Sequence, residues 1–99
     1  MSLTKLVEKY IISADRVFDE ITVVNGYAGF FNAKVKQVLE LAKAYLQDAK
    51  YYRDCGKLEV SLASVAYCEG LLDALKMLGM VKFEWPKKKV EENEGESGR

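Results

Sequence analysis

The segment 48–80 most constrains the fold, because it joins two helical patterns through one tight turn. Apolar residues over 31–52 recur at alternating spacings of four and three, the period of one side of an α-helix. Gly56 follows and can adopt the left-handed conformation that ends a helix. A second helical pattern then covers 58–78. The segment therefore predicts two antiparallel helices joined at Gly56.

A further amphipathic pattern precedes this pair, with apolar residues from Leu3 to Ile21 on one arc and charged residues opposite. The chain has 99 residues, 49% of them hydrophobic and 30% charged, which suits one domain with one core. Asn25-Gly26 is a turn dipeptide that can close a β-hairpin. Because helical patterns adjoin it, we interpret 22–29 as an interhelical loop. These patterns predict an all-α, three-helix, up-and-down antiparallel bundle over residues 1–85, with helices at about 3–22, 30–55 and 58–78.

The C-terminal end changes character after the third helix. Val81, Phe83 and Trp85 alternate with charged residues, as in an extended segment that lays one side on the bundle. Residues 86–99 are polar and charged, and they predict a disordered tail. Lys87-Lys88-Lys89 within it can be a solubilising feature, or it can touch nucleic acid or an acidic partner.

The third predicted helix differs from the other two, because apolar residues cover more than half of its circumference. Such a helix packs on two sides, so it contacts either both other helices or one helix and an oligomer partner. Gly70 stands within it at a cost of about 1 kcal/mol relative to alanine. This glycine suggests the close approach of another backbone or of a ligand, and it forms a small-residue notch with Ala66.

The sequence contains no histidine and two cysteines, which excludes most sites with metal or nucleophile chemistry. Common zinc sites need more ligands of these types, and di-iron sites in helical bundles need Glu-x-x-His pairs. Serine or cysteine nucleophiles activated by histidine are excluded too, and no glycine-rich phosphate loop is present. We therefore expect no enzyme activity, no cofactor and no catalytic or metal-binding residue.

Carboxylates and tyrosines remain as candidates for a ligand or interaction notch. Glu69 and Asp73 lie one helical turn apart beside Gly70, and paired carboxylates can hold a cation or transfer protons. The alternative is that Glu69 and Asp73 form a solvated face and that Asp48 hydrogen-bonds a tyrosine hydroxyl, such as that of Tyr67. Tyr51 lies on the outer side of its helix and is a candidate for contact with a partner. The candidate notch residues are Asp48, Tyr51, Tyr67, Glu69, Gly70 and Asp73.

Charge and cysteine placement bear on the compartment and on partners. Fifteen basic and fifteen acidic residues cancel, whereas nucleic-acid binders usually carry a basic excess. Cys55 and Cys68 are predicted to lie roughly 15 Å apart across the hairpin, too far for a disulfide. Free thiols favour a cytoplasmic setting. No uncharged run approaches membrane-spanning length, and no signal peptide is evident.

The hairpin resembles an archaeal family of small proteins, the domain of unknown function 357. The residues that carry the resemblance are Asp48-Ala49-Lys50-Tyr51-Tyr52, Gly56, Ala63, Tyr67, Gly70, Leu72-Asp73-Ala74 and Leu78-Gly79. The resemblance implies a three-helix bundle in the archaeal cytoplasm, with no established activity. Some relatives carry this domain beside nucleotidyltransferase-like domains, which implies an accessory role.

The hairpin is also similar, more weakly, to HEPN-type helical domains. Active HEPN ribonucleases use an Arg-x4-His motif, so a chain without histidine can only be a non-catalytic relative. Two functions follow as hypotheses. One is a non-enzymatic protein-interaction or accessory domain, with a protein partner or a homodimer through the third helix. The other is an accessory module, related to nucleotidyltransferase or HEPN systems, that binds a small ligand or nucleic acid at the notch.

Overall fold

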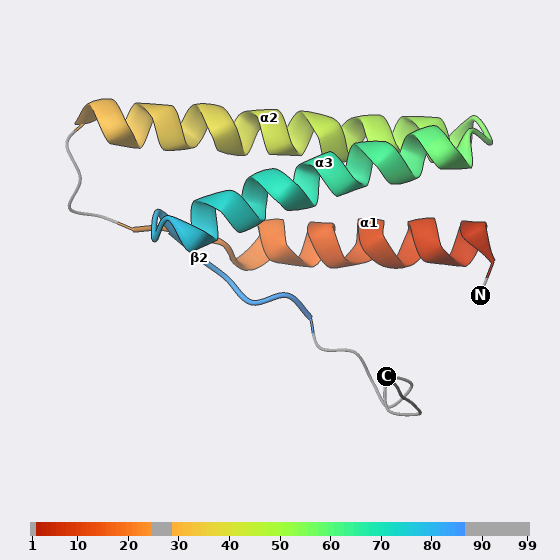
Figure 1. The fold of residues 1–99 in the computed structure, drawn as a ribbon, viewed down its shortest axis with the longest axis horizontal. Coiled ribbons are helices and arrows are strands. Elements are labelled where there is room, and N and C mark those ends of the chain that lie inside the picture. Colours follow the sequence, from red (N-terminus) through yellow and green to blue (C-terminus); the bar gives the residue numbers. More distant parts are fainter. Residues whose placement is uncertain (1, 25–28, 87–99) are drawn as a thin grey trace.

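A computed structural model describes residues 2–24 and 29–86 as a three-helix bundle (Figure 1). The helices are α1 (Leu3–Glu20), α2 (Gly29–Asp54) and α3 (Leu58–Met77). α1 and α3 run in the same direction, and α2 runs antiparallel to both. The predicted all-α, up-and-down bundle is thereby confirmed. The Asn25-Gly26 turn, the Lys87-Lys88-Lys89 run and the rest of the predicted tail after Pro86 lie outside the described residues.

Local sequence fixes the start of α1. Ser2 is extended, with φ −82° and ψ 160°, and its hydroxyl accepts a hydrogen bond from the backbone N–H of Lys5. A serine in this position satisfies one of the N–H groups that the first turn leaves without a helical partner.

Glycines end both later helices in the same way. Gly56 and Gly79 have φ of 79° and 76°, the left-handed region that only glycine enters at no steric cost. After Gly56, Lys57 N–H donates to the carbonyl of Tyr52; after Gly79, Met80 N–H donates to that of Leu75. With the shorter bond from each glycine, these are Schellman motifs, and they fix where α2 and α3 stop.

The core forms where the three helices meet, and α3 is central to it. α3 packs most extensively on α2 and also on α1, while α1 and α2 touch each other least. Close packing of α2 and α3 depends on small residues: the buried Ser61 hydroxyl donates a 2.6 Å hydrogen bond to the carbonyl of Ala49. The buried residues of the helices are Val7, Ile11, Ala14 and Val17 of α1, Val35, Ala42, Leu46 and Ala49 of α2, and Ser61, Val65, Cys68, Leu72 and Leu75 of α3.

Two short strands correct the predicted loop after α1. β1 (Thr22–Val23) pairs antiparallel with β2 (Val81–Lys82), and α1 ends at Glu20 rather than near residue 22. The interpretation as loop was wrong for Thr22 and Val23, because their partner strand lies far away in the sequence. The ladder joins the end of α1 to the end of α3 (Figure 1).

The segment after α3 lies on the bundle with alternating sides. Val81 and Phe83 are buried, Lys82 and Glu84 are exposed, and Trp85 is half-buried. Phe83 and Trp85 meet edge to face at 5.1 Å. The alternation that the sequence predicted is therefore observed.

Candidate functional site

α3 leaves one of its two apolar sides uncovered by the rest of the described chain. Of the seven large hydrophobic residues that are exposed in the described part of the chain, four lie on α3 or at its end: Val60, Tyr67, Met77 and Leu78. They share this side with small residues, and we call the whole surface the outer face of α3. Its members are Val60, Ala63, Ala66, Tyr67, Gly70, Ala74, Met77 and Leu78, all of which are exposed.

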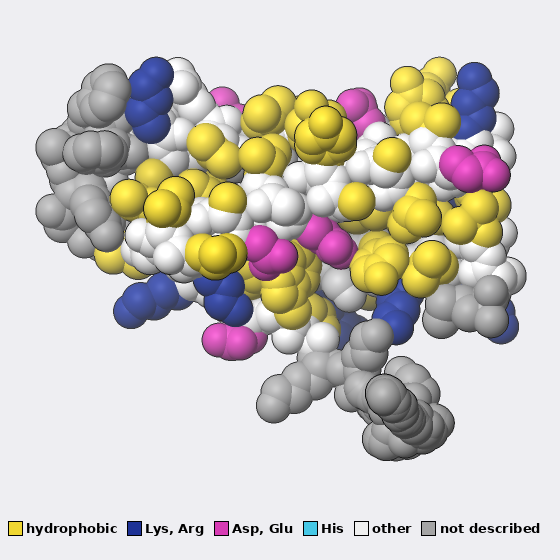
Figure 2. Space-filling model, in the orientation of Figure 1, with side chains coloured by type: hydrophobic (Ala, Val, Ile, Leu, Met, Phe, Trp, Pro, Cys, Tyr) yellow, Lys and Arg dark blue, Asp and Glu magenta, His cyan; other side chains and the backbone are white. Residues whose placement is uncertain are grey.

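Figure 2 shows this surface from the front, with hydrophobic side chains (yellow) along the band of α3 and on α2 above it. Acidic side chains (magenta) interrupt the hydrophobic ones near the middle of the view. Exposed Leu78 is 67% accessible, whereas Leu72, on the inner side of the same helix, is 0% accessible. The outer face therefore consists of apolar surface that the fold itself does not use.

Gly70 lies at the centre of the outer face. A Cβ built on Gly70 would meet no atom within 4 Å, so no backbone approaches it among the described residues. Of the two approaches expected at this glycine, that of another backbone is not made by the described chain, and that of a ligand stays a prediction. Ala66, Gly70 and Ala74 recur every fourth residue, and we call them the small-residue row. A shallow hollow of ≈570 Å³ at this part of the face is lined by Ala63, Ala66, Tyr67, Gly70 and Leu71.

Tyr67 forms the edge of the outer face that adjoins α2. Its ring stacks on Tyr45 of α2, with ring centres 4.9 Å apart and planes 14° from parallel. The structure thus gives Tyr67 an aromatic partner. The alternative hydrogen bond between Tyr67 and Asp48 is not observed, because Asp48 is exposed and makes no hydrogen bond or ion pair among the described residues.

Glu69 and Asp73 form the opposite edge, which we call the acidic flank. The Asp73 carboxylate accepts a 2.7 Å hydrogen bond from the indole N–H of Trp85, so Asp73 anchors the C-terminal segment. Burial raises the pKa of Glu69, and the negative charge of Asp73 raises it further. No cation pairs with either carboxylate within residues 2–24 and 29–86.

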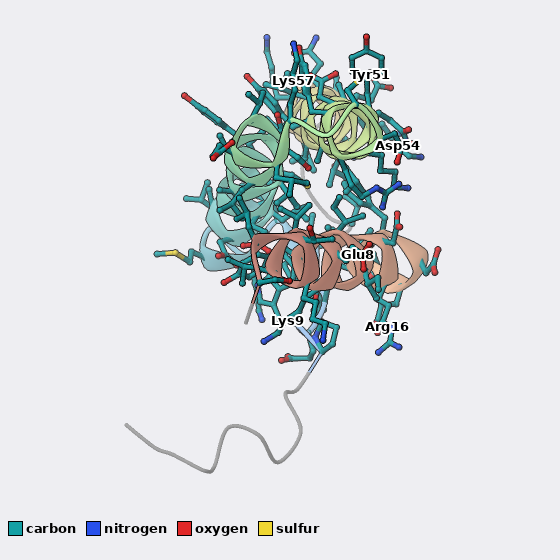
Figure 3. The ribbon with its side chains drawn as sticks, turned by 90° about the vertical axis from the view of Figure 1, so that its right-hand side faces the viewer. Glu8, Lys9, Arg16, Tyr51, Asp54 and Lys57 are labelled. Carbon is teal, nitrogen blue, oxygen red and sulfur yellow. The ribbon has the colours of Figure 1, made fainter. Side chains whose placement is uncertain are left out.

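Four of the six predicted notch residues come together, and two lie elsewhere. Tyr67, Glu69, Gly70 and Asp73 lie on or beside the outer face, whereas Asp48 and Tyr51 belong to α2. Figure 3 shows Tyr51 pointing away from both α1 and α3. A hydrogen bond with exposed Cys55 is the main cause that raises the pKa of Tyr51.

Sequence reasoning missed two residues of this site, Tyr45 and Trp85. The sequence indicates Tyr45 only as part of the apolar pattern over 31–52, and Trp85 only as part of the extended segment that lies on the bundle. Their pairing with Tyr67 and Asp73 joins different elements, and helical spacing cannot reveal contacts of this kind.

The part of the chain that the structure describes contains no group of three or more Cys, Asp or Glu residues placed to hold a metal ion. Both cysteines are free, Cys55 exposed and Cys68 buried. Within the described ranges, every helix is too short or too polar to cross a membrane. The chemistry that this site offers is thus apolar contact beside two carboxylates.

Comparison with known proteins gives one family. The family described as "Protein of unknown function (DUF357)" matches residues 9–81, which is 73 of the 99 residues and includes α2, α3 and α1 from Lys9 onward. No curated protein and no solved structure matches the chain. The match includes the outer face of α3 up to Leu78 and ends at the first residue of β2. The chain belongs to the DUF357 family.

Proposed function

We propose that this protein is a non-enzymatic interaction module and that the outer face of α3 is its binding surface. One observation carries the proposal: α3 packs on both other helices and still exposes the apolar residues of its outer face. Exposed hydrophobic residues are ordinary when they are scattered, as Ile12 and Tyr51 are here. A contiguous set on one helix is typical of an interaction site.

The composition of the face supports a protein partner rather than nucleic acid. Between Leu58 and Leu75, α3 carries three carboxylates and no lysine or arginine. Such a surface repels phosphates. We place the module in the cytoplasm, in keeping with its two free thiols.

The small-residue row provides a direct test of the proposal. Gly70→Leu fills the centre of the face with a side chain, and its Cβ has open space around it, so the bundle remains folded. Ala44→Leu is the matched control, because Ala44 is exposed on α2. Both variants should unfold at temperatures close to that of the wild type by circular dichroism.

Affinity capture from the source organism's lysate, with the full chain as bait, then compares the three proteins. The wild type and Ala44→Leu should retain the same partner, and Gly70→Leu should lose it. Light scattering in parallel shows whether the partner is a second copy. A partner that Gly70→Leu retains would place the binding surface elsewhere and would contradict the proposal.

A further inference from the structure

The two edges of the outer face differ in chemistry, and this difference restricts what can bind. One edge is aromatic and aliphatic, with Tyr67 stacked on Tyr45 and Leu71 half-buried beside them. The other edge is the acidic flank of Glu69 and Asp73. The small-residue row runs between these edges, so a partner that contacts the row touches both.

No cation of the described chain balances the acidic flank. The first basic residue of α3 is Lys76, whose ammonium lies 3.7 Å from a carboxylate oxygen of Glu84 and 4.9 Å from the ring centre of Phe83. A partner that covers the flank without a cation would remove water from two carboxylates and would weaken its own binding. A lysine or arginine at this edge would instead form charge-assisted hydrogen bonds with them.

We propose that the outer face binds one amphipathic helix of another protein, with small or apolar residues along its contact side and Lys or Arg along one flank. The small-residue row lets a helix backbone approach closely, because Ala66, Gly70 and Ala74 project little from α3. The aromatic edge takes the apolar side of the incoming helix, and the acidic flank takes its cations. This inference rests on the proposed function and names the partner's chemistry.

A second copy of this chain fits the face less well. In an antiparallel pair about Gly70, like edges meet, so Glu69 and Asp73 of one copy would face the same carboxylates of the other. In a parallel pair, the acidic flank of each copy would meet the Tyr67 edge, again without a cation. Both arrangements leave the carboxylates at an interface without a cation, which is costly.

The chain's own C-terminal residues also lack the required chemistry. Residues 87–99 contain the three lysines but only one large apolar residue, Val90. They cannot supply an apolar stripe as long as the small-residue row. Charge complementarity together with an apolar stripe therefore favours a separate basic amphipathic helix.

Three synthetic helical peptides with one shared Ala/Leu contact side test this inference. Their flanking positions are all Lys, all Gln or all Glu, and binding to the full chain is followed by NMR chemical shifts at the amides of Ala66, Gly70 and Ala74. We expect the Lys peptide to bind about tenfold more tightly than the Gln peptide, from two new charge pairs. The Glu peptide should bind most weakly, and added salt should reduce these differences.

The combined variant Glu69→Gln and Asp73→Asn should bring the affinities for the three peptides close together. The side-chain amide that Asp73→Asn introduces keeps an oxygen that can accept from Trp85, so the C-terminal segment stays in place. Glu40→Gln, which removes an exposed carboxylate of α2, is the control and should keep the preference for the Lys peptide.

Equal binding of the three peptides to the wild type would overturn the inference about charge. Binding that disappears in Gly70→Leu would then still support the outer face as an interaction surface. Failure of every peptide to bind, or self-association that Gly70→Leu abolishes, would also overturn the basic helix as partner. Retention of a lysate partner by Gly70→Leu would contradict the proposed function itself.

Discussion

α1 and α3 lie side by side in the same direction, but they use their apolar residues differently. α1 buries one row, with Val7, Ile11, Ala14 and Val17 at most 1% exposed, and presents charged residues on its other side. α3 buries an inner row and exposes a second apolar row. The apolar surface of α1 is therefore explained by the fold alone, while that of α3 exceeds what the fold requires.

The largest difference between buried and exposed residues is expected in the reactivity of the two thiols. Burial, followed by the charges of Glu69 and Asp15, raises the pKa of Cys68 from 9.0 to about 12. A pKa this high lowers the reactive thiolate fraction about a thousandfold relative to an ordinary thiol. At pH 8, a disulfide reagent should therefore label exposed Cys55 promptly and Cys68 only upon unfolding. Mass spectrometry of tryptic peptides checks this order, and prompt labelling of Cys68 in the folded chain would show that α3 is not packed as described.

Two leucines, Leu72 within α3 and Leu78 at its end, test how much a buried and an exposed apolar side chain contribute to the free energy of unfolding. Leu72 is fully buried and Leu78 is 67% exposed. Leu72→Ala should cost about 2–5 kcal/mol of unfolding free energy, and Leu78→Ala less than about 0.5 kcal/mol. Urea denaturation at low protein concentration measures both variants. Similar losses in the two would mean that the outer face is covered in the free protein.

Gly70→Ala tests the exposed side of α3 and should raise the free energy of unfolding, whereas the leucine substitutions lower it. Gly70 is helical, and its Cβ position is empty, so alanine should stabilise α3 by about 1 kcal/mol. The increase appears as a higher urea midpoint with an unchanged slope. A destabilised variant would instead reveal a contact at Gly70 that the described residues do not make.

The smallest effect is expected at the acidic flank, as a change in the way stability depends on pH. Because the pKa of Glu69 is raised above its ordinary 4.5, the folded chain binds this proton more tightly than the unfolded chain. Its contribution to stability is therefore lost as pH rises from 4.5 through the raised value. Glu69→Gln should show a shallower decline of melting temperature with pH across this range than the wild type. Parallel curves for the two proteins would contradict the shift.

Sequence predicted the elements of this fold better than their orientation. The pattern of α1 identifies its buried row because charged residues mark the opposite side, and Gly56 and Gly79 mark helix ends because a left-handed residue is needed there. α3 lacks such marks. Ser61 and Cys68 are buried while Tyr67 and Leu78 are outside, because small side chains let α3 approach α2 closely.

The remaining differences between prediction and structure involve contacts between distant segments. β1 has no strong strand pattern of its own and exists through its pairing with β2. Asp73 gains its role as an anchor from Trp85, which follows the helix and folds back. Residue spacing reports the local period of a chain, so contacts of this kind require the structure.

The pairing of Thr22 with Lys82 has a consequence for the order of folding. Sixty positions separate these residues, so forming the ladder closes a loop that contains most of the chain, at a substantial cost in entropy. The turn at Gly56, in contrast, joins neighbours and can form early. We therefore expect the α2–α3 hairpin to be structured in the folding transition state and the ladder to form last. Substitutions at the ladder would then accelerate unfolding and leave the refolding rate unchanged.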